Sequence, residues 1–222
     1  DTTESRGLGD VYKRQKMTIF IKICGVTNLK DAEASLRKGA DAIGFIQSKK
    51  SERFVTLETL KGIKNGIGTN FLTIPVFVNP STEEVENFLN IFPNSILQFH
   101  GDEEEEFCKS FDTRYIKAIN VSNQEDLMND INRYKDSYAY LLDSGDSQNR
   151  GGTGETFDWK LIPKLLSNKI IVAGGLDSNN INVLLDTIIP FGVDVSSGVE
   201  SKKGVKDHSK IDKFIKLVKK YE

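Results

Sequence analysis

The chain has 222 residues, of which 38% are hydrophobic and 28% charged, and its formal net charge is −2. These values are typical of a soluble folded protein; they exclude a disordered chain and imply no nucleic-acid partner. No run approaches the roughly 18 to 20 apolar residues of a membrane helix, and the N-terminus lacks an apolar signal core. We therefore expect a cytoplasmic protein without a membrane partner.

The N-terminal stretch, residues 1–16, shows no hydrophobic period, and Met17 directly precedes the first strand-like run. We interpret residues 1–16 as a tag, a linker or translated upstream sequence outside the fold. The remaining residues, 17–222, are then the folded domain. Eight βα units in about 200 residues leave little room for a second domain.

Eight short β-rich runs alternate with segments of helical period along the domain, which predicts βα units and a parallel sheet. Most of the runs are continuously apolar, as in strands that are covered on both faces. The count predicts an α/β fold, a single closed (β/α)₈ barrel of eight parallel strands. An open doubly wound sheet would carry a glycine-rich dinucleotide turn after its first strand, and CGVTN is not such a turn. The predicted strands are 20–24, 42–46, 74–78, 96–99, 115–119, 139–142, 170–173 and 193–195.

Several helices have readable ends. Asn28 and Ser81 each precede a helical pattern and are suited to cap its free amides, and Gly39 fits a helix stop. The acidic run Asp102–Glu106 suggests either a cation site or the solvated first turn of a helix, and we expect the helix turn. His208 begins the pattern of the last helix.

Two cysteines and two histidines are too few and too scattered for a zinc site or a disulfide framework. We expect free thiols. Cys108 falls within a helical pattern and is interpreted as core filling, because free cysteine packs as a small hydrophobe. Cys24 ends the first strand, so it is either an inert buried thiol or a reactive group at the exposed end of the strand.

A closed barrel places its active site at the C-terminal ends of its strands. The last two loops, AGGLDSNN and DVSSGVE, offer close backbone approach, amide donors and hydroxyl groups, and such loops are the recurrent phosphate site of this fold. The alternative is that their glycines only make tight turns. Residues at strand ends are Cys24, His100, Asp143, Gly174, Gly175, Asp194, Ser196 and Ser197.

Five motifs, in order and with family spacing, resemble phosphoribosylanthranilate isomerase: KICGVT, QFHGDE, LLDS followed by GGTGETFDW, AGGL and VDVSSGVE. AGGL-like turns alone occur in many phosphate-binding barrels, whereas KICG, GGTGETFDW and DVSSGVE together are specific. The resemblance extends from Met17 to the C-terminus. It implies an aldose–ketose isomerase of tryptophan biosynthesis that needs no cofactor and acts on a small phosphorylated substrate.

The implied reaction is an Amadori rearrangement of N-(5-phosphoribosyl)anthranilate to 1-(2-carboxyphenylamino)-1-deoxyribulose 5-phosphate. By the match, Cys24 is the general base, Asp143 the general acid, and Arg53 faces the anthranilate carboxylate. The phosphate is held by the loops that contain Gly174, Gly175, Ser196 and Ser197. His100 either orients the substrate or satisfies a loop carbonyl, and Asp194 positions either the phosphate-loop amides or the substrate hydroxyls.

The chain departs from the family pattern at Lys49, where many members carry proline. The polar connection Ser144–Glu155 is long for a βα loop, and we interpret it as a lid that closes over the substrate. We expect a monomer or a homodimer. Two other functions compete: the related aminoaldose isomerase of histidine biosynthesis, and a silent barrel that only binds a sugar phosphate.

Overall fold

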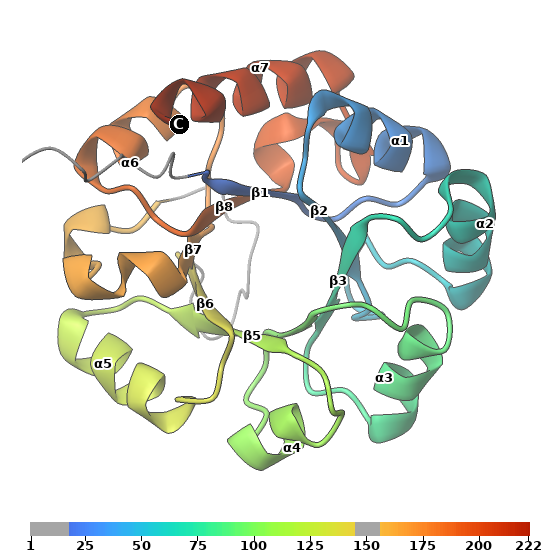
Figure 1. Ribbon diagram of the computed structural model, residues 1–222, viewed down its shortest axis with the longest axis horizontal. Coiled ribbons are helices and arrows are strands. Elements are labelled where there is room, and N and C mark those ends of the chain that lie inside the picture. The colour runs from blue at the N-terminus through green and yellow to red at the C-terminus, as the bar shows by residue number, and fades with distance from the viewer. Residues whose placement is uncertain (1–17, 145–155) are drawn as a thin grey trace, which may run out of the picture.

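The computed structural model describes residues 18–144 and 156–222, and these form a closed barrel of eight parallel strands. The strands pair in chain order and β8 pairs with β1, which closes the barrel. Figure 1 shows the strands around a common centre with the helices outside them. The predicted single (β/α)₈ barrel is confirmed. The strands are β1 (Phe20–Ile23), β2 (Ala42–Ile46), β3 (Leu72–Phe77), β4 (Leu97–Phe99), β5 (Tyr115–Asn120), β6 (Ala139–Asp143), β7 (Ile170–Val172) and β8 (Gly192–Val195).

The helices cover the outer face of the barrel wall (Figure 1). Their predicted ends are confirmed: Asn28 accepts a hydrogen bond from the amide of Asp31, Ser81 forms a capping box with Glu84, and Gly39 ends its helix in the left-handed conformation. The α-helices are α1 (Leu29–Lys38), α2 (Leu57–Ile67), α3 (Thr82–Leu89), α4 (Glu105–Lys109), α5 (Gln124–Arg133), α6 (Ile181–Thr187) and α7 (His208–Val218).

Alternation along each strand divides the core into two parts. On β6, Leu141 belongs to a cluster inside the barrel, whereas Tyr140 and Leu142 pack between the wall and the helices. A strand buried on both faces needs apolar residues at nearly every position, which is why the predicted runs are continuously apolar. Cys108 is fully buried in the outer part of the core, so its assignment as core filling is confirmed.

The described part of the segment between β6 and β7 lacks the α-helix that the alternation of strands and helices predicts. It contains two 3₁₀ helices, η1 (Trp159–Leu161) and η2 (Lys164–Lys169), on either side of Pro163. Proline disfavours the α conformation in the residue before it and provides no amide donor, so a continuous α-helix cannot form across this position.

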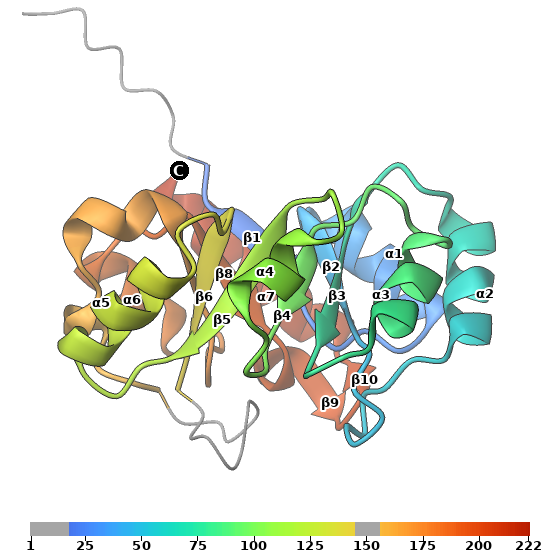
Figure 2. The same ribbon diagram turned by 90° about the horizontal axis from the view of Figure 1, so that it is seen from below.

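A short antiparallel ribbon follows β8 and was not predicted. It pairs β9 (Glu200–Lys202) with β10 (Val205–Lys206), and Gly204 turns between them with a φ of 77°. Figure 2 shows this ribbon at the lower rim of the barrel. The backbone oxygen of Gly204 accepts a hydrogen bond from Thr27 at 2.6 Å, so the ribbon lies against the loop that follows β1.

Candidate active site

The barrel interior changes from apolar to polar toward the C-terminal ends of the strands. Phe20 on β1 stacks on Phe191 near the N-terminal end, with ring centroids 5.6 Å apart. Two residues further along β1, Lys22 is completely buried and lies in register with Asp194 of β8. The next position with this orientation is Cys24, directly after β1. A strand presents alternate residues to one face, so these three side chains share the inside of the barrel.

Cys24 lies at the end of β1, and its side chain is largely buried, with 6% of the residue exposed. Its amide donates to the backbone oxygen of Val195 at 2.9 Å, and the next residue, Gly25, has a φ of 69° that favours glycine. Burial raises the pKa of the thiol most, and the carboxylate of Asp194 raises it further; Lys22 and Lys206 oppose this rise. Cys24 is a free thiol, as predicted.

Asp143, the last residue of β6, is also largely buried and lies beside His100, which follows β4. The distance from Nε2 of His100 to Oδ2 of Asp143 is 3.5 Å. A Cβ atom at Gly174, after β7, would lie 2.8 Å from Oδ1 of Asp143, and the φ of Gly174 is 78°. Glycine is therefore required there by both backbone conformation and close approach.

A line of polar contacts crosses the interior from β8 to β6. The ammonium of Lys22 donates to Oδ2 of Asp194 at 2.9 Å and to Oε1 of Gln98 at 2.8 Å. Because Oε1 of Gln98 accepts from the lysine, its amide nitrogen faces Nδ1 of His100, 3.1 Å away. That network assigns the His100 proton to Nε2, which faces Asp143.

Arg53, in the loop after β2, forms a two-bond ion pair with Glu200 of β9. Nε and Nη2 of the guanidinium each donate to one carboxylate oxygen at 2.8 Å. Lys206 of β10 also donates to Glu200, at 3.0 Å. A Cβ atom at Gly25 would lie 2.7 Å from Cδ of Arg53 and 2.9 Å from Oγ of Ser196, so Arg53 lies at the same rim as Cys24.

The loops after β7 and β8 approach each other closely. Gly174 and Gly175 have φ values of 78° and 63°. A Cβ atom at Gly198 would collide with the backbone oxygen of Leu176, so the two loops are in backbone contact. The hydroxyl of Ser196 is buried and has no hydrogen-bond partner among the described residues. Ser197 begins a 3₁₀ turn, Ser197–Val199, and is half-buried.

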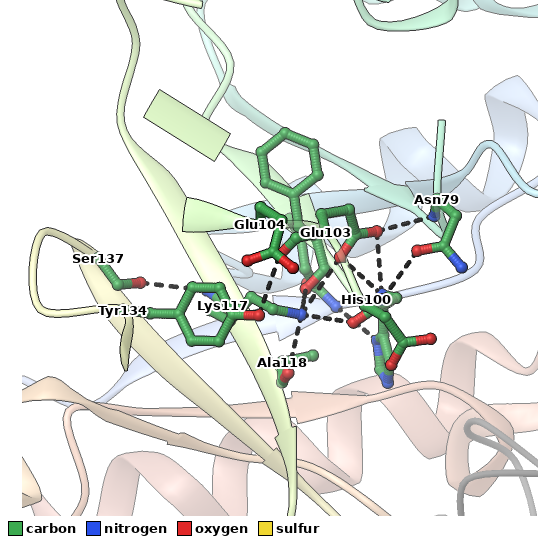
Figure 3. Close-up of polar contacts among 12 residues, drawn as sticks. Asn79, His100, Glu103, Glu104, Lys117, Ala118, Tyr134 and Ser137 are labelled. Carbon is green, nitrogen blue, oxygen red and sulfur yellow. Dashed lines mark hydrogen bonds and ion pairs between the residues drawn. The ribbon is translucent and has the colours of Figure 1, made fainter. Parts of the chain in front are cut away.

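The acidic run after β4 is only partly the solvated helix turn that we expected. Glu105 and Glu106 lie in the first turn of α4, but Glu103 is buried and pairs with Lys117 of β5 at 3.2 Å. Figure 3 shows the ammonium of Lys117 beside Glu103, and it also donates to the backbone oxygen of Gly101 at 2.7 Å. A lysine fixed in the barrel wall thus anchors the loop that follows His100.

The structure brings most of the predicted site residues to one end of the barrel, and several residues there were missed. The residues missed are Lys22, Gln98, Glu200, Lys206 and Lys117. Lys22 meets Gln98 from 76 positions away and Glu200 meets Arg53 from 147 positions away, whereas Lys206 is only six positions from Glu200. The overlooked signal is a lysine inside an apolar strand run, in FIKIC and again in YIKAI, since a buried lysine requires a partner. The lid expected at Ser144–Glu155 lies outside the described residues except for Ser144.

Two further properties bear on the kind of site. Among residues 18–144 and 156–222, no cluster of three or more histidine, cysteine or carboxylate side chains is arranged to hold a metal ion. No helix in the described part of the chain is long and apolar enough to cross a membrane.

A closed parallel barrel that gathers a thiol, carboxylates and cations at the C-terminal ends of its strands places the chain among (β/α)₈-barrel enzymes. Residues 21–217 match the family model described as N-(5'phosphoribosyl)anthranilate (PRA) isomerase. An N-(5'-phosphoribosyl)anthranilate isomerase of Legionella pneumophila is 42% identical over 90% of this chain and 97% of its own. The chain belongs to this family, and the predicted aldose–ketose isomerase of tryptophan biosynthesis is confirmed.

Solved structures agree. The phosphoribosyl anthranilate isomerase of Thermotoga maritima superposes with a TM-score of 0.82 at 36% identity, over 91% of this chain and all of that one. A phosphoribosyl anthranilate isomerase in complex with reduced 1-(o-carboxyphenylamino)-1-deoxyribulose 5-phosphate superposes with a TM-score of 0.78, also at 36% identity and with the same coverage.

Proposed function

We propose that the chain converts N-(5-phosphoribosyl)anthranilate to 1-(2-carboxyphenylamino)-1-deoxyribulose 5-phosphate with Asp143 as general acid and Cys24 as general base. The observation that supports this assignment most is the convergence of β1 and β6 on one mouth. Both side chains face the interior, and β7 and β8 separate their strands. A substrate stretched across the mouth meets acid and base on different atoms.

The first chemical step is ring opening. Asp143 donates its proton to the furanose oxygen, the bond from C1 to that oxygen breaks, and the nitrogen lone pair forms the Schiff base. This role requires the carboxylic acid form of Asp143. His100 faces the carboxylate that remains, because its Nε2 proton lies on that side.

The second step is removal of the proton on C2. The Schiff base acidifies this proton, and the thiolate of Cys24 removes it to give the enolamine. The enolamine becomes the aminoketose when C1 gains a proton and the hydroxyl on C2 loses one. The thiolate, not the thiol, is the reactive base, so activity depends on the thiol pKa. The cations around Cys24 support this role.

Binding is assigned to the two ends of the substrate. The loops at Gly174, Gly175, Ser196 and Ser197 supply amides and hydroxyls for the phosphate, and the buried hydroxyl of Ser196 supports this. Arg53 meets the anthranilate carboxylate with guanidinium protons beyond the two it gives Glu200, since arginine has five donors. Asp194 accepts from Lys22 through Oδ2, and its buried Oδ1, which has no hydrogen-bond partner among the described residues, is assigned to a substrate hydroxyl.

The test is loss of anthranilate fluorescence when freshly prepared phosphoribosylanthranilate is added to the purified chain. We expect rapid loss with the predicted product, and no turnover of the aminoaldose of histidine biosynthesis in a parallel assay. Turnover of the histidine-pathway aminoaldose alone would contradict our proposal and favour the isomerase of histidine biosynthesis. No turnover of either substrate would favour a silent barrel that only binds a sugar phosphate. Monomeric or homodimeric state and cytoplasmic location remain predictions.

A further inference from the structure

Lys22 is an unusual residue for the interior of a barrel. Its side chain is fully buried, and it is among the largest fully buried side chains of the described residues. An unpaired buried ammonium is very costly, so natural proteins keep such a group only where it has partners. Asp194 and Gln98 are those partners, at 2.9 Å and 2.8 Å.

The side chains of Lys22 and Cys24 lie side by side over Gly44 of β2. A Cβ atom at Gly44 would lie 2.8 Å from Sγ of Cys24 and 3.0 Å from Cε of Lys22. Glycine therefore leaves the space that both side chains fill. Cys24 directly follows β1, two positions after Lys22, so the extended backbone directs both side chains to the same face of the barrel wall.

The charged groups around the thiol come from five elements. Lys22 lies on β1, Asp194 on β8, Lys206 on β10, and Arg53 in the loop after β2; Glu200 of β9 pairs with Lys206 and Arg53. Three cations and two carboxylates give this group one excess positive charge. A thiolate formed at Cys24 would balance this charge.

Of the two lysines in this group, Lys22 is the one that keeps its charge better. Burial alone lowers its pKa, but Asp194 and Cys24 together raise the pKa above the ordinary lysine value. The pKa of Lys206 is instead lowered, chiefly by burial, although Glu200 opposes this. The fixed charge beside the thiol is therefore the ammonium of Lys22.

We propose that Lys22 is a positioning residue whose buried ammonium, held by Asp194 and Gln98, stabilises the thiolate of Cys24. This inference rests on the proposed function, because it concerns Cys24, the base assigned to proton removal. In this proposal Lys22 acts on the thiol and is assigned neither a proton transfer nor a contact with substrate. Its effect is electrostatic and is present before substrate binds.

The experiment measures alkylation of Cys24 by iodoacetamide in the free chain at pH 8, followed by mass spectrometry of the modified peptide. Alkylation depends on the thiolate fraction, so Lys22→Met is expected to slow it by about tenfold or more, whereas Asp194→Asn is expected to accelerate it. Lys38→Met removes one cation of an ion pair outside the barrel and serves as the control. We expect the control to stay within about twofold of the parent.

A variant that leaves one buried charge unpaired can lose its fold, so the lysine is also removed in the Asp194→Asn background. In that background position 194 has no carboxylate that could lose its partner. Lys22→Met is again expected to slow alkylation, by at least about threefold. Circular dichroism checks the fold of each variant. The proposal is overturned if removal of Lys22 leaves the rate within twofold of its own background, or if Lys22→Met and Asp194→Asn change it in the same direction. Because no substrate is present, absent isomerase turnover would refute the proposed function without affecting this result.

Discussion

Individual residues at the barrel mouth carry the proposed chemistry, and Asp143 carries the first step. We expect Asp143→Asn to lower kcat by at least about a hundredfold with little change in KM, because the amide keeps the shape but has no acidic proton. Steady-state kinetics with phosphoribosylanthranilate measures both constants. Turnover close to that of the parent would remove Asp143 from the role of general acid.

The pKa of the Cys24 thiol sets how the reactivity of this residue depends on pH. Burial, followed by Asp194, raises its pKa above the ordinary cysteine value, and the active form is the thiolate. The rate at which iodoacetamide alkylates Cys24 in the free chain is therefore expected to rise with pH from neutrality up to the thiol pKa, because the thiolate fraction rises over that range. A pH profile of the alkylation rate checks this, and a fall in that rate between pH 7 and pH 9 would contradict it.

Residue identities at the site were partly predictable. Cys24, Asp143 and the glycines after β7 occupy strand ends that the sequence marks clearly, so barrel geometry alone places them together. The partners of Lys22 were not predictable, because Gln98 and Asp194 are 76 and 172 positions away along the chain. Only the closed barrel brings these three into contact, and one sequence contains no signal of that pairing.

At the scale of single elements, buried ion pairs matter more than surface ones. Lys117 pairs with Glu103 deep in the wall, whereas Lys49 pairs with Glu84 on the surface, where 75% of the lysine side chain is exposed. We expect Lys117→Met to lower the free energy of unfolding by about 3–5 kcal/mol. Lys49→Met, the matched control, is expected to change it by less than about 1 kcal/mol. Urea denaturation measures both, and equal effects would contradict this ranking.

The glycines of the elements divide into required and replaceable ones. Gly62 lies inside α2, and a Cβ atom there would meet nothing within 4 Å. Gly62→Ala is expected to raise the free energy of unfolding by about 0.5–1 kcal/mol, because alanine loses less backbone freedom on folding. Denaturant titration of the variant is the measurement. A lower stability than the parent would be the contrary result.

Gly174, in contrast to Gly62, is a glycine that the structure requires. Its positive φ and its proximity to Asp143 leave no room for a side chain. Gly174→Ala is expected to displace the carboxyl and to lower kcat/KM by at least about tenfold. A kinetic comparison with Gly62→Ala separates an effect on the site from a general effect of added methyl groups, and equal activity of the two variants would contradict the account.

Element ends and types follow from local chemistry, so most were predictable. The caps at Asn28 and Ser81 and the apolar strand runs depend on neighbours in sequence, and the structure confirms them. The exceptions depend on distant contacts or on a single breaker. Glu103 is buried because Lys117 meets it from the next strand, and Pro163 interrupts the helix expected after β6.

For the molecule as a whole, closure of the barrel is the property on which the site depends. β8 pairs with β1 over four residues, and that pairing sets Lys22 beside Asp194. We predict that residues 1–16 contribute nothing to this structure, so that a chain beginning at Met17 keeps the parent's melting temperature and turnover. Differential scanning calorimetry and the fluorescence assay test this. A clear drop in melting temperature or turnover would show that residues 1–16 contribute to the folded domain.

The central claim is that a thiol on β1 and a carboxyl on β6 act together across one barrel mouth. Its most direct measurement is the rate at which the parent chain and Cys24→Ala consume phosphoribosylanthranilate under identical conditions. We predict rapid consumption by the parent and a kcat at least about a hundredfold lower for Cys24→Ala. An inactive parent, or a variant that keeps the parent's rate, would contradict the account.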